Sequence, residues 1–166
     1  MTSDGVSQHR EEAANEINVA VITVSDTRTI ETDRGGQTIL DLLEPTNHRV
    51  ISRAIVKDEP REIVATINSV TADAILITGG TGISARDQTY ETITELLDKP
   101  IPGYGELFRM LSYEEIGAAS MLSRATGGIR GNTVILTMPG STNAVKLAMK
   151  KLIIPELAHL VHEATK

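Results

Sequence analysis

The part of the sequence best suited to chemistry is a cluster of glycines followed by an Arg-Asp pair. In the stretch ILITGGTGISARDQT, Gly79, Gly80 and Gly82 follow an apolar run and precede Arg86 and Asp87. A glycine-rich loop that leads into a helix offers unhindered backbone N–H groups and the positive end of the helix dipole, the usual cradle for phosphate. Taken alone, the stretch also fits a simple turn or the relaxed dinucleotide pattern GxGxxG/A.

Similar polar residues follow the other strand-like runs of the chain. They are Ser25, Asp26 and Arg28 after the first run, Asp58 after the second, and Pro139, Gly140, Ser141 and Asn143 after the last. If the strands are parallel, all of these loops open at one edge of the sheet, where ligands of open α/β sheets bind. Asp58 and Asp87 then lie on neighbouring loops and are plausible ligands for a Mg²⁺ ion that bridges phosphate oxygens. The set of loops favours a phosphate site.

Several of these residues also have a structural interpretation. Asp58 and Asp87 stand at predicted helix starts, where Asp caps free N–H groups and interacts favourably with the dipole. Ser141 is a natural N-cap for the same reason. Ser25 and Asp26 are typical of a local turn.

Two other classes of nucleotide-binding protein are disfavoured by the motifs. The chain has no GxxxxGK[ST] sequence, which excludes a P-loop NTPase. The GxGxxG/A match follows the third predicted strand rather than the first. A dinucleotide-binding fold would have an acidic residue at the end of a strand in the segment 99–106, but this segment reads as a loop. An NAD-linked enzyme is therefore only a distant competitor.

Strand-like and helix-like segments alternate along the chain and must position these loops. Runs rich in β-branched and aliphatic residues predict strands at 17–25, 49–56, 72–78 and 131–140. Apolar residues at helical spacing predict helices at 35–44, 59–70, 88–97, 102–117, 118–126 and 141–166, the last restarted at Pro155. This alternation predicts an α/β fold with a mostly parallel sheet covered on both faces. Residues 17–166 are expected to form one domain, preceded by a flexible polar extension, residues 1–16.

The composition disfavours several classes of partner and site. A formal net charge of −6 leaves no broad basic surface for nucleic acid or a membrane. Only one Phe and three Tyr are present, too few for a platform that stacks single-stranded bases. The absence of cysteine excludes disulfides and thiolate chemistry. With no signal-peptide pattern near its start, the protein is expected to be cytoplasmic.

Six blocks of the sequence resemble the molybdopterin-binding family, which includes MoaB, MogA and the G domain of gephyrin. The blocks follow the family order and cover the chain from residue 17 onward: VITVSDTR, VKDEP, ITGGTGISARDQT, IPGYGELFRMLS, SMLSRATGGIRG and MPGSTNAV. The short length and the last block most resemble the MoaB branch. The resemblance implies a three-layer α/β/α sandwich that assembles into a trimer or a dimer of trimers. It also implies a place in molybdenum cofactor biosynthesis.

The resemblance further implies a reaction and its residues. In active family members, molybdopterin and Mg-ATP give molybdopterin-AMP and pyrophosphate. Asp58 and Asp87 match the family's acidic residues that act in catalysis through Mg²⁺. The residues expected to bind molybdopterin or ATP are Ser25, Asp26, Gly79, Gly80, Thr81, Gly82, Arg86, Ser123, Pro139, Gly140, Ser141 and Asn143. Other proteins of the pathway are further possible partners.

The implied reaction needs few protein groups. Its nucleophile, the terminal phosphate of molybdopterin, has a second pKa of about 6 and is largely dianionic near neutral pH, so no His or Cys base is required. The difficulty is to bring two anions together. A metal ion, loop amides and Arg86 or Arg28 would counter their repulsion. The alternative is a non-catalytic molybdopterin carrier of the same pathway; a gephyrin-like scaffold is disfavoured because gephyrin uses additional domains.

Overall fold

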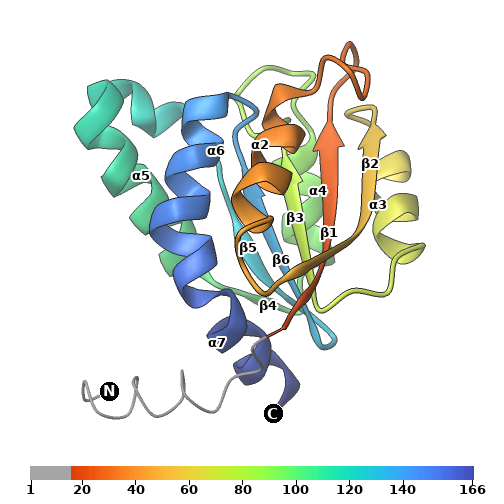
Figure 1. The fold of residues 1–166 in the computed structure, drawn as a ribbon. Helices are drawn as coiled ribbons and strands as arrows, with labels where there is room; N and C mark the ends of the chain where they lie inside the picture. The colour runs from red at the N-terminus through yellow and green to blue at the C-terminus, as the bar shows by residue number, and fades with distance from the viewer. Residues whose placement is uncertain (1–15) are drawn as a thin grey trace.

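The computed structural model describes residues 16–166; of the predicted flexible extension, residues 1–16, all but Glu16 lies outside the described residues. One six-stranded sheet has the strand order β2-β1-β3-β6-β5-β4 (Figure 1). Four neighbouring strands are parallel: β2 (Arg49–Val56), β1 (Asn18–Val24), β3 (Ala74–Thr78) and β6 (Thr133–Met138). Two short strands complete the sheet, β5 (Gly127–Arg130), antiparallel to both of its neighbours, and β4 (Lys99–Pro100). The predicted mostly parallel sheet is confirmed.

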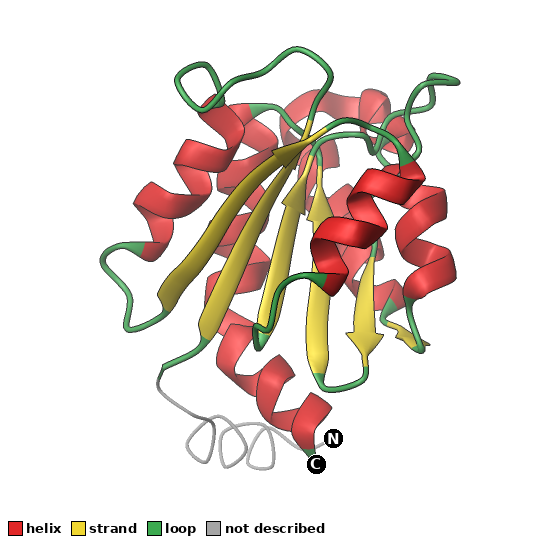
Figure 2. Cartoon of the chain, turned by 90° about the vertical axis from the view of Figure 1, so that its right-hand side faces the viewer, coloured by secondary structure: helices red, strands yellow, loops and turns green. Residues whose placement is uncertain are grey.

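Helices cover both faces of this sheet (Figure 2). Successive strand residues point to opposite faces, so Val19 and Val21 join one apolar cluster, whereas Ala20 and Ile22 join another. The first cluster packs against α2 (Arg34–Leu43), α5 (Pro102–Ile116), α6 (Thr142–Ala148) and α7 (Ile154–Thr165). The second packs against α3 (Pro60–Asn68) and α4 (Thr89–Leu96). The three-layer α/β/α architecture is therefore confirmed.

The segment between α4 and β6 differs from the prediction. Residues 99–106 are not a loop, because Lys99 and Pro100 pair with β5 and α5 begins at Pro102. A proline can begin this helix because the first helical N–H groups have no partner within the helix. The helix predicted at 118–126 is wrong beyond Leu122: η1 (Gly117–Leu122) is a 3-10 helix, and Ser123 is extended. Strand β5, which was not predicted, begins at the edge where the parallel strands end. It therefore brings residues 123–126 to that edge.

The C-terminal helical segment is interrupted, as predicted. After α6, the π-helical turn η2 (Met149–Ile153) leads into α7, and Pro155 stands in the first turn of α7. A proline is tolerated there because the first helical N–H groups have no partner within the helix. In Figure 1, α7 and the start of β1 lie at the opposite end of the sheet from the strand carboxyl ends. Within residues 16–166, no helix has the length and apolar character that crossing a membrane requires.

Candidate functional site

The carboxyl ends of β1, β2, β3 and β6 meet at one edge of the sheet, as the sequence predicts (Figure 2). The loops after these strands remain in contact beyond the last ladder pairs. The N–H of Ser25 donates to the carbonyl of Val56 at 2.8 Å, and the N–H of Gly79 donates to the carbonyl of Met138 at 3.0 Å. The predicted loops therefore form one continuous surface.

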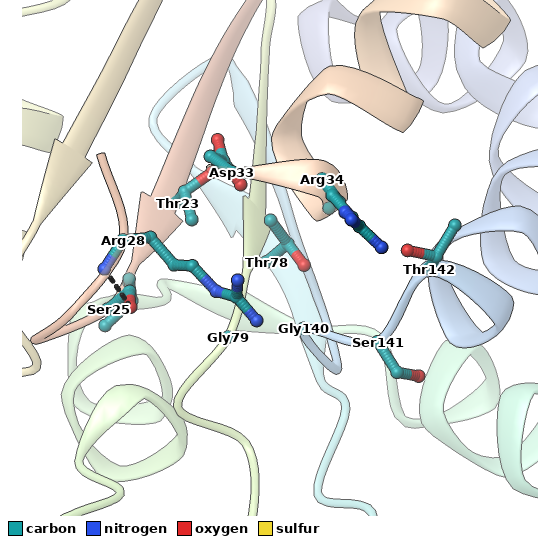
Figure 3. Close-up of a pocket in the computed structure, with 12 residues that line it drawn as sticks. Thr23, Ser25, Arg28, Asp33, Arg34, Thr78, Gly79, Gly140, Ser141 and Thr142 are labelled. Carbon is teal, nitrogen blue, oxygen red and sulfur yellow. Dashed lines mark hydrogen bonds between the residues drawn. The ribbon is translucent and has the colours of Figure 1, made fainter. Parts of the chain in front are cut away.

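A cavity of about 500 Å³, the arginine cavity, lies between these loops and the first turn of α2 (Figure 3). Figure 3 shows the guanidinium groups of Arg28 and Arg34 on either side of Thr78. The lining also includes Thr23, Val24, Ser25, Asp33, Gly35, Gly79, Gly140, Ser141 and Thr142. Two cations and several hydroxyls around a helix start are a suitable environment for phosphate.

A second cavity of about 400 Å³, the glycine-loop cavity, shares Gly79, Gly140 and Ser141 with the first. One side of it is the predicted glycine loop, residues 79–82, together with Asp87. The other residues of its lining are Phe108, Ser112 and Ile116 of α5, Leu122 of η1, Ser123, Pro139 and Ala144. Apolar walls beside a few polar groups are typical of a site for an organic ring. The two cavities together suit a pair of ligands that carry both rings and phosphates.

The two cavities adjoin at Gly79, Gly140 and Ser141, which line both of them. A Cβ at Gly140 would lie 3.5 Å from the Cα of Gly79. Gly79 itself has a φ of 102°, which side chains rarely allow, and a Cβ there would overlap the carbonyl of Val24. These glycines let the loops after β3 and β6 approach closely where the cavities adjoin.

Neither Asp58 nor Asp87 caps the helix that follows it, so that structural prediction is wrong. Asp58 is buried, and its Oδ1 accepts hydrogen bonds from the N–H of Gln88 at 3.1 Å and the hydroxyl of Thr89 at 3.5 Å. It therefore holds the start of α4 from another loop. The Oδ2 of Asp87 turns back to accept the N–H of Ser84 at 2.9 Å. The N-cap positions of α3 and α4 are Glu59 and Gln88.

Both carboxyl groups flank the glycine loop. The Oδ2 of Asp58 leaves no room for a Cβ at Gly80, and the Oδ2 of Asp87 would lie 2.8 Å from a Cβ at Gly82. Burial raises the pKa of Asp58, while the N–H of Gln88 lowers it and the nearby carboxylate of Asp87 raises it again. Charge is therefore costly here, and a cation would relieve the repulsion.

The carboxylates of Asp58 and Asp87 fit Mg²⁺, which is commonly bound by one or two carboxylates and the phosphate oxygens of a substrate. Within residues 16–166, no group of three His, Cys, Asp or Glu side chains could hold a metal ion by itself. Asp58 and Asp87 are thus suited to an ion that arrives with a phosphate ligand.

Arg86 lines neither cavity, and its guanidinium is bound by two carboxylates on other loops. Its Nε donates to Asp26 Oδ2 at 2.7 Å, and its Nη1 donates to Glu59 Oε1 at 2.6 Å. The hydrogen bond from Arg86 lowers the pKa of Asp26. Asp26, Arg86 and Asn143 line neither cavity, whereas the other predicted binding residues do. Of the two arginines proposed to counter phosphate charge, Arg28 is the one that lines a cavity.

Ser25 and Ser141 have the local roles that the sequence suggests. The Oγ of Ser25 accepts the N–H groups of Thr27 at 3.3 Å and Arg28 at 3.1 Å, which forms the predicted turn (Figure 3). The Oγ of Ser141 accepts the N–H of Ala144 at 3.3 Å as the N-cap of α6. Both residues also line the cavities, so the structural and binding interpretations are compatible.

Sequence reasoning missed Asp33, the buried N-cap of α2. Its Oδ1 accepts the N–H of Gly36 at 2.9 Å. Its Oδ2 accepts the hydroxyl of Thr23 at 2.8 Å and pairs with Arg53 at 3.1 Å. The signal was an Asp two residues before a predicted helix, and its neighbour Arg34 is the second cation of the arginine cavity.

The chain is similar to proteins of molybdenum cofactor biosynthesis. Residues 20–159 match the family described as "Probable molybdopterin binding domain". Molybdenum cofactor biosynthesis protein B of Bacillus subtilis (strain 168) is 51% identical over 166 residues, 97% of this chain and 98% of its own. A crystal structure of molybdenum cofactor biosynthesis protein B has a TM-score of 0.88 at 49% identity, over 92% of this chain and 98% of that one. For the tungsten cofactor synthesizing protein MoaB from Pyrococcus furiosus the TM-score is 0.84 at 37% identity, over 93% and 100% of the chains. The matched residues include every loop that lines the two cavities.

Proposed function

The chain belongs to the family of probable molybdopterin binding domains and has a role in molybdenum cofactor biosynthesis, and from this premise we propose that it adenylylates molybdopterin with Mg-ATP. The observation that carries the proposal is the pair of cavities that adjoin at Gly79 and Gly140. Each offers polar contacts for phosphate at this boundary. Molybdopterin and ATP, one in each cavity, would present their phosphates to each other there.

The proposed reaction is a phosphoryl-group displacement. An oxygen of the molybdopterin phosphate attacks the α-phosphorus of ATP, the bond to the β-phosphate oxygen breaks, and pyrophosphate leaves with that electron pair. No general base is needed because the attacking oxygen already carries charge. The protein must hold the two anions in line and offset their charge, which is how phosphoryl transfer is generally catalysed.

Particular side chains are suited to each of these tasks. Arg28 and Arg34 would pair with phosphate oxygens in the arginine cavity. N–H groups of the glycine loop would bind the phosphate in the adjoining cavity. Asp58 and Asp87 would hold Mg²⁺, which neutralises charge on phosphate oxygens when it is bound. The raised pKa of Asp58 is consistent with a carboxylate that gains from a cation.

The test is direct measurement of product. Purified protein with molybdopterin, ATP and Mg²⁺ should form molybdopterin-AMP and pyrophosphate. Asp87→Ala should reduce the rate by about 100-fold or more while molybdopterin binding survives. Asp41→Asn, on the exposed side of α2, should leave the rate unchanged. Tight molybdopterin binding by the wild type without any product would contradict the proposal and support the carrier alternative.

The homo-oligomer implied by the family is also a proposal, and an apolar surface on α5 and η1 supports it. The surface consists of Leu107, Met110, Tyr113, Ile116, Met121 and Leu122, which are 47–71% exposed. Clustered large apolar side chains on the outside of a protein are typical of an interaction site. We expect the wild type to be an oligomer by analytical ultracentrifugation and Met110→Glu to dissociate it. A wild-type monomer would contradict this.

A further inference from the structure

We propose that Arg124 is a positioning residue that fixes both ends of the segment 82–87, and thereby sets Asp87 relative to the glycine loop. The consequence for catalysis rests on the proposed function, whereas the anchoring itself does not. Arg124 lies between η1 and β5 and lines neither cavity. It therefore acts through the segment that it holds.

Three hydrogen bonds join Arg124 to this part of the chain. Its backbone N–H donates to the carbonyl of Thr81 at 3.0 Å. Its Nε donates to the carbonyl of Gly82 at 2.8 Å, and its Nη2 donates to the carbonyl of Asp87 at 3.2 Å. One guanidinium thus bridges the first and last residues of the segment.

The guanidinium is itself held on the side of α4. Its Nη1 pairs with the carboxylate of Glu91, and its central carbon lies 5.0 Å from the centre of the Tyr90 ring. The hydrogen bond from Arg124 lowers the pKa of Glu91. Because the side chain is only 25% exposed and contacts partners through all three nitrogens, it is preorganised before any ligand binds.

The conformation of the segment between the two anchors sets the direction of the Asp87 side chain. Ser84 and Asp87 close a small turn, in which the N–H of Ser84 donates to Asp87 Oδ2 and the N–H of Asp87 donates to the carbonyl of Ser84, both at 2.9 Å. Ile83, Ser84 and Ala85 are exposed. Arg86 inside the segment is also held, by exposed pairs with Asp26 and Glu59. The carbonyl anchors at Gly82 and Asp87 are the contacts that fix the two ends of the segment, and the second of them is on the residue that carries the Asp87 carboxylate.

Lysine cannot replace arginine in this role. The planar guanidinium reaches two carbonyls and a carboxylate in fixed directions and stacks on an aromatic ring, whereas an ammonium is a point charge on a flexible stem. Arg124→Lys therefore keeps the charge and removes the bridge. Arg130→Lys is the matched control, because Arg130 is the last residue of β5 and its Nη1 donates to Asn68 Oδ1 at the end of α3 at 2.7 Å, not to residues 82–87.

Hydrogen exchange followed by mass spectrometry tests the anchoring without any ligand. We expect faster exchange in peptides that cover residues 82–87 of Arg124→Lys, and wild-type exchange in Arg130→Lys. Glu91→Gln weakens the ion pair with Nη1 of Arg124 and leaves both carbonyl contacts in place. It should show a smaller increase in exchange, and it replaces Arg124→Lys in the test if that variant does not fold. Unchanged exchange in both Arg124→Lys and Glu91→Gln would overturn the proposal.

The adenylylation assay tests the catalytic consequence. A displacement of about 1 Å in a positioned group can lower a rate by about 100-fold, so kcat of Arg124→Lys should fall by that order. KM for molybdopterin should change little, because the cavity lining is intact, and a higher Mg²⁺ concentration should be needed for half-maximal rate. Faster exchange with unchanged kcat would overturn the catalytic role. If the wild type forms no product, the proposed function fails, and the exchange result alone decides the anchoring.

Discussion

Replacing Gly80 with alanine tests how closely the glycine loop packs against Asp58. Gly80 has a φ of 66°, in the left-handed region, where alanine costs about 1–2 kcal/mol. The added Cβ would overlap the hydroxyl of Thr89 and the Oδ2 of Asp58, both in buried residues, and such overpacking costs about 1–3 kcal/mol. Loss of glycine flexibility in the unfolded chain offsets about 0.5 kcal/mol. We therefore expect the free energy of unfolding to fall by about 3 kcal/mol.

Urea unfolding followed by circular dichroism measures this change. Gly103→Ala is the matched control, because a Cβ at Gly103 meets nothing within 4 Å and alanine is preferred over glycine in a helix by up to about 1 kcal/mol. The control should be as stable as the wild type or more so. A loss below about 0.5 kcal/mol for Gly80→Ala, with an unchanged denaturant slope, would refute the close packing of the loop. The variant should also lose adenylylation, because the Asp58 carboxylate must move.

Further variants test the buried polar groups. Asp33→Ala removes the N-cap of α2 and leaves Arg53 without its buried partner, so it should lower the free energy of unfolding by about 3 kcal/mol in urea unfolding. Tyr104→Phe deletes the 3.0 Å hydrogen bond to the carbonyl of Thr137 and should cost about 1 kcal/mol in the same measurement. The raised pKa of Asp58 means that the folded state binds its proton more tightly than the unfolded state. Its contribution to stability is therefore present below the ordinary carboxyl pKa of about 4 and is lost as pH rises through the higher folded value. In EDTA, the Tm of Asp58→Asn should fall less than that of the wild type as pH rises above about 4. Equal pH profiles of Tm for the two proteins would contradict the raised pKa of Asp58.

The parallel part of the sheet could be predicted because each strand has its own sequence pattern. Val19 to Val24 and Ala74 to Thr78 are buried on both faces, so they read as continuous apolar runs. The direction of these strands then placed Ser25, Asp58, Gly79 and Gly140 at one edge. Strand β5 has no such pattern, because half of its four residues are glycine and its place depends on backbone pairing with β4 and β6.

Long-range contacts of the candidate site could not be predicted for the same reason. Arg124 reaches Gly82 across 42 positions of sequence, and only the antiparallel direction of β5 brings it there. Likewise, spacing placed Arg86 near the glycine loop but could not show that Asp26 and Glu59 on two other loops bind its guanidinium. Local sequence identifies which residues can carry charge, whereas tertiary pairing decides which of them face a cavity.

The direct junction of the two cavities at Gly79, Gly140 and Ser141 has a consequence for how long the product stays bound. On the proposed function, molybdopterin-AMP spans Gly79 and Gly140 and occupies both cavities at once, so it is a bivalent ligand. Linking two binding halves raises affinity over either half by about 10²–10⁴-fold through effective concentration. Most of that gain is a slower dissociation rate. The protein would therefore retain its product longer than either substrate, and departure of the product, rather than formation of the phosphoanhydride bond, would limit turnover.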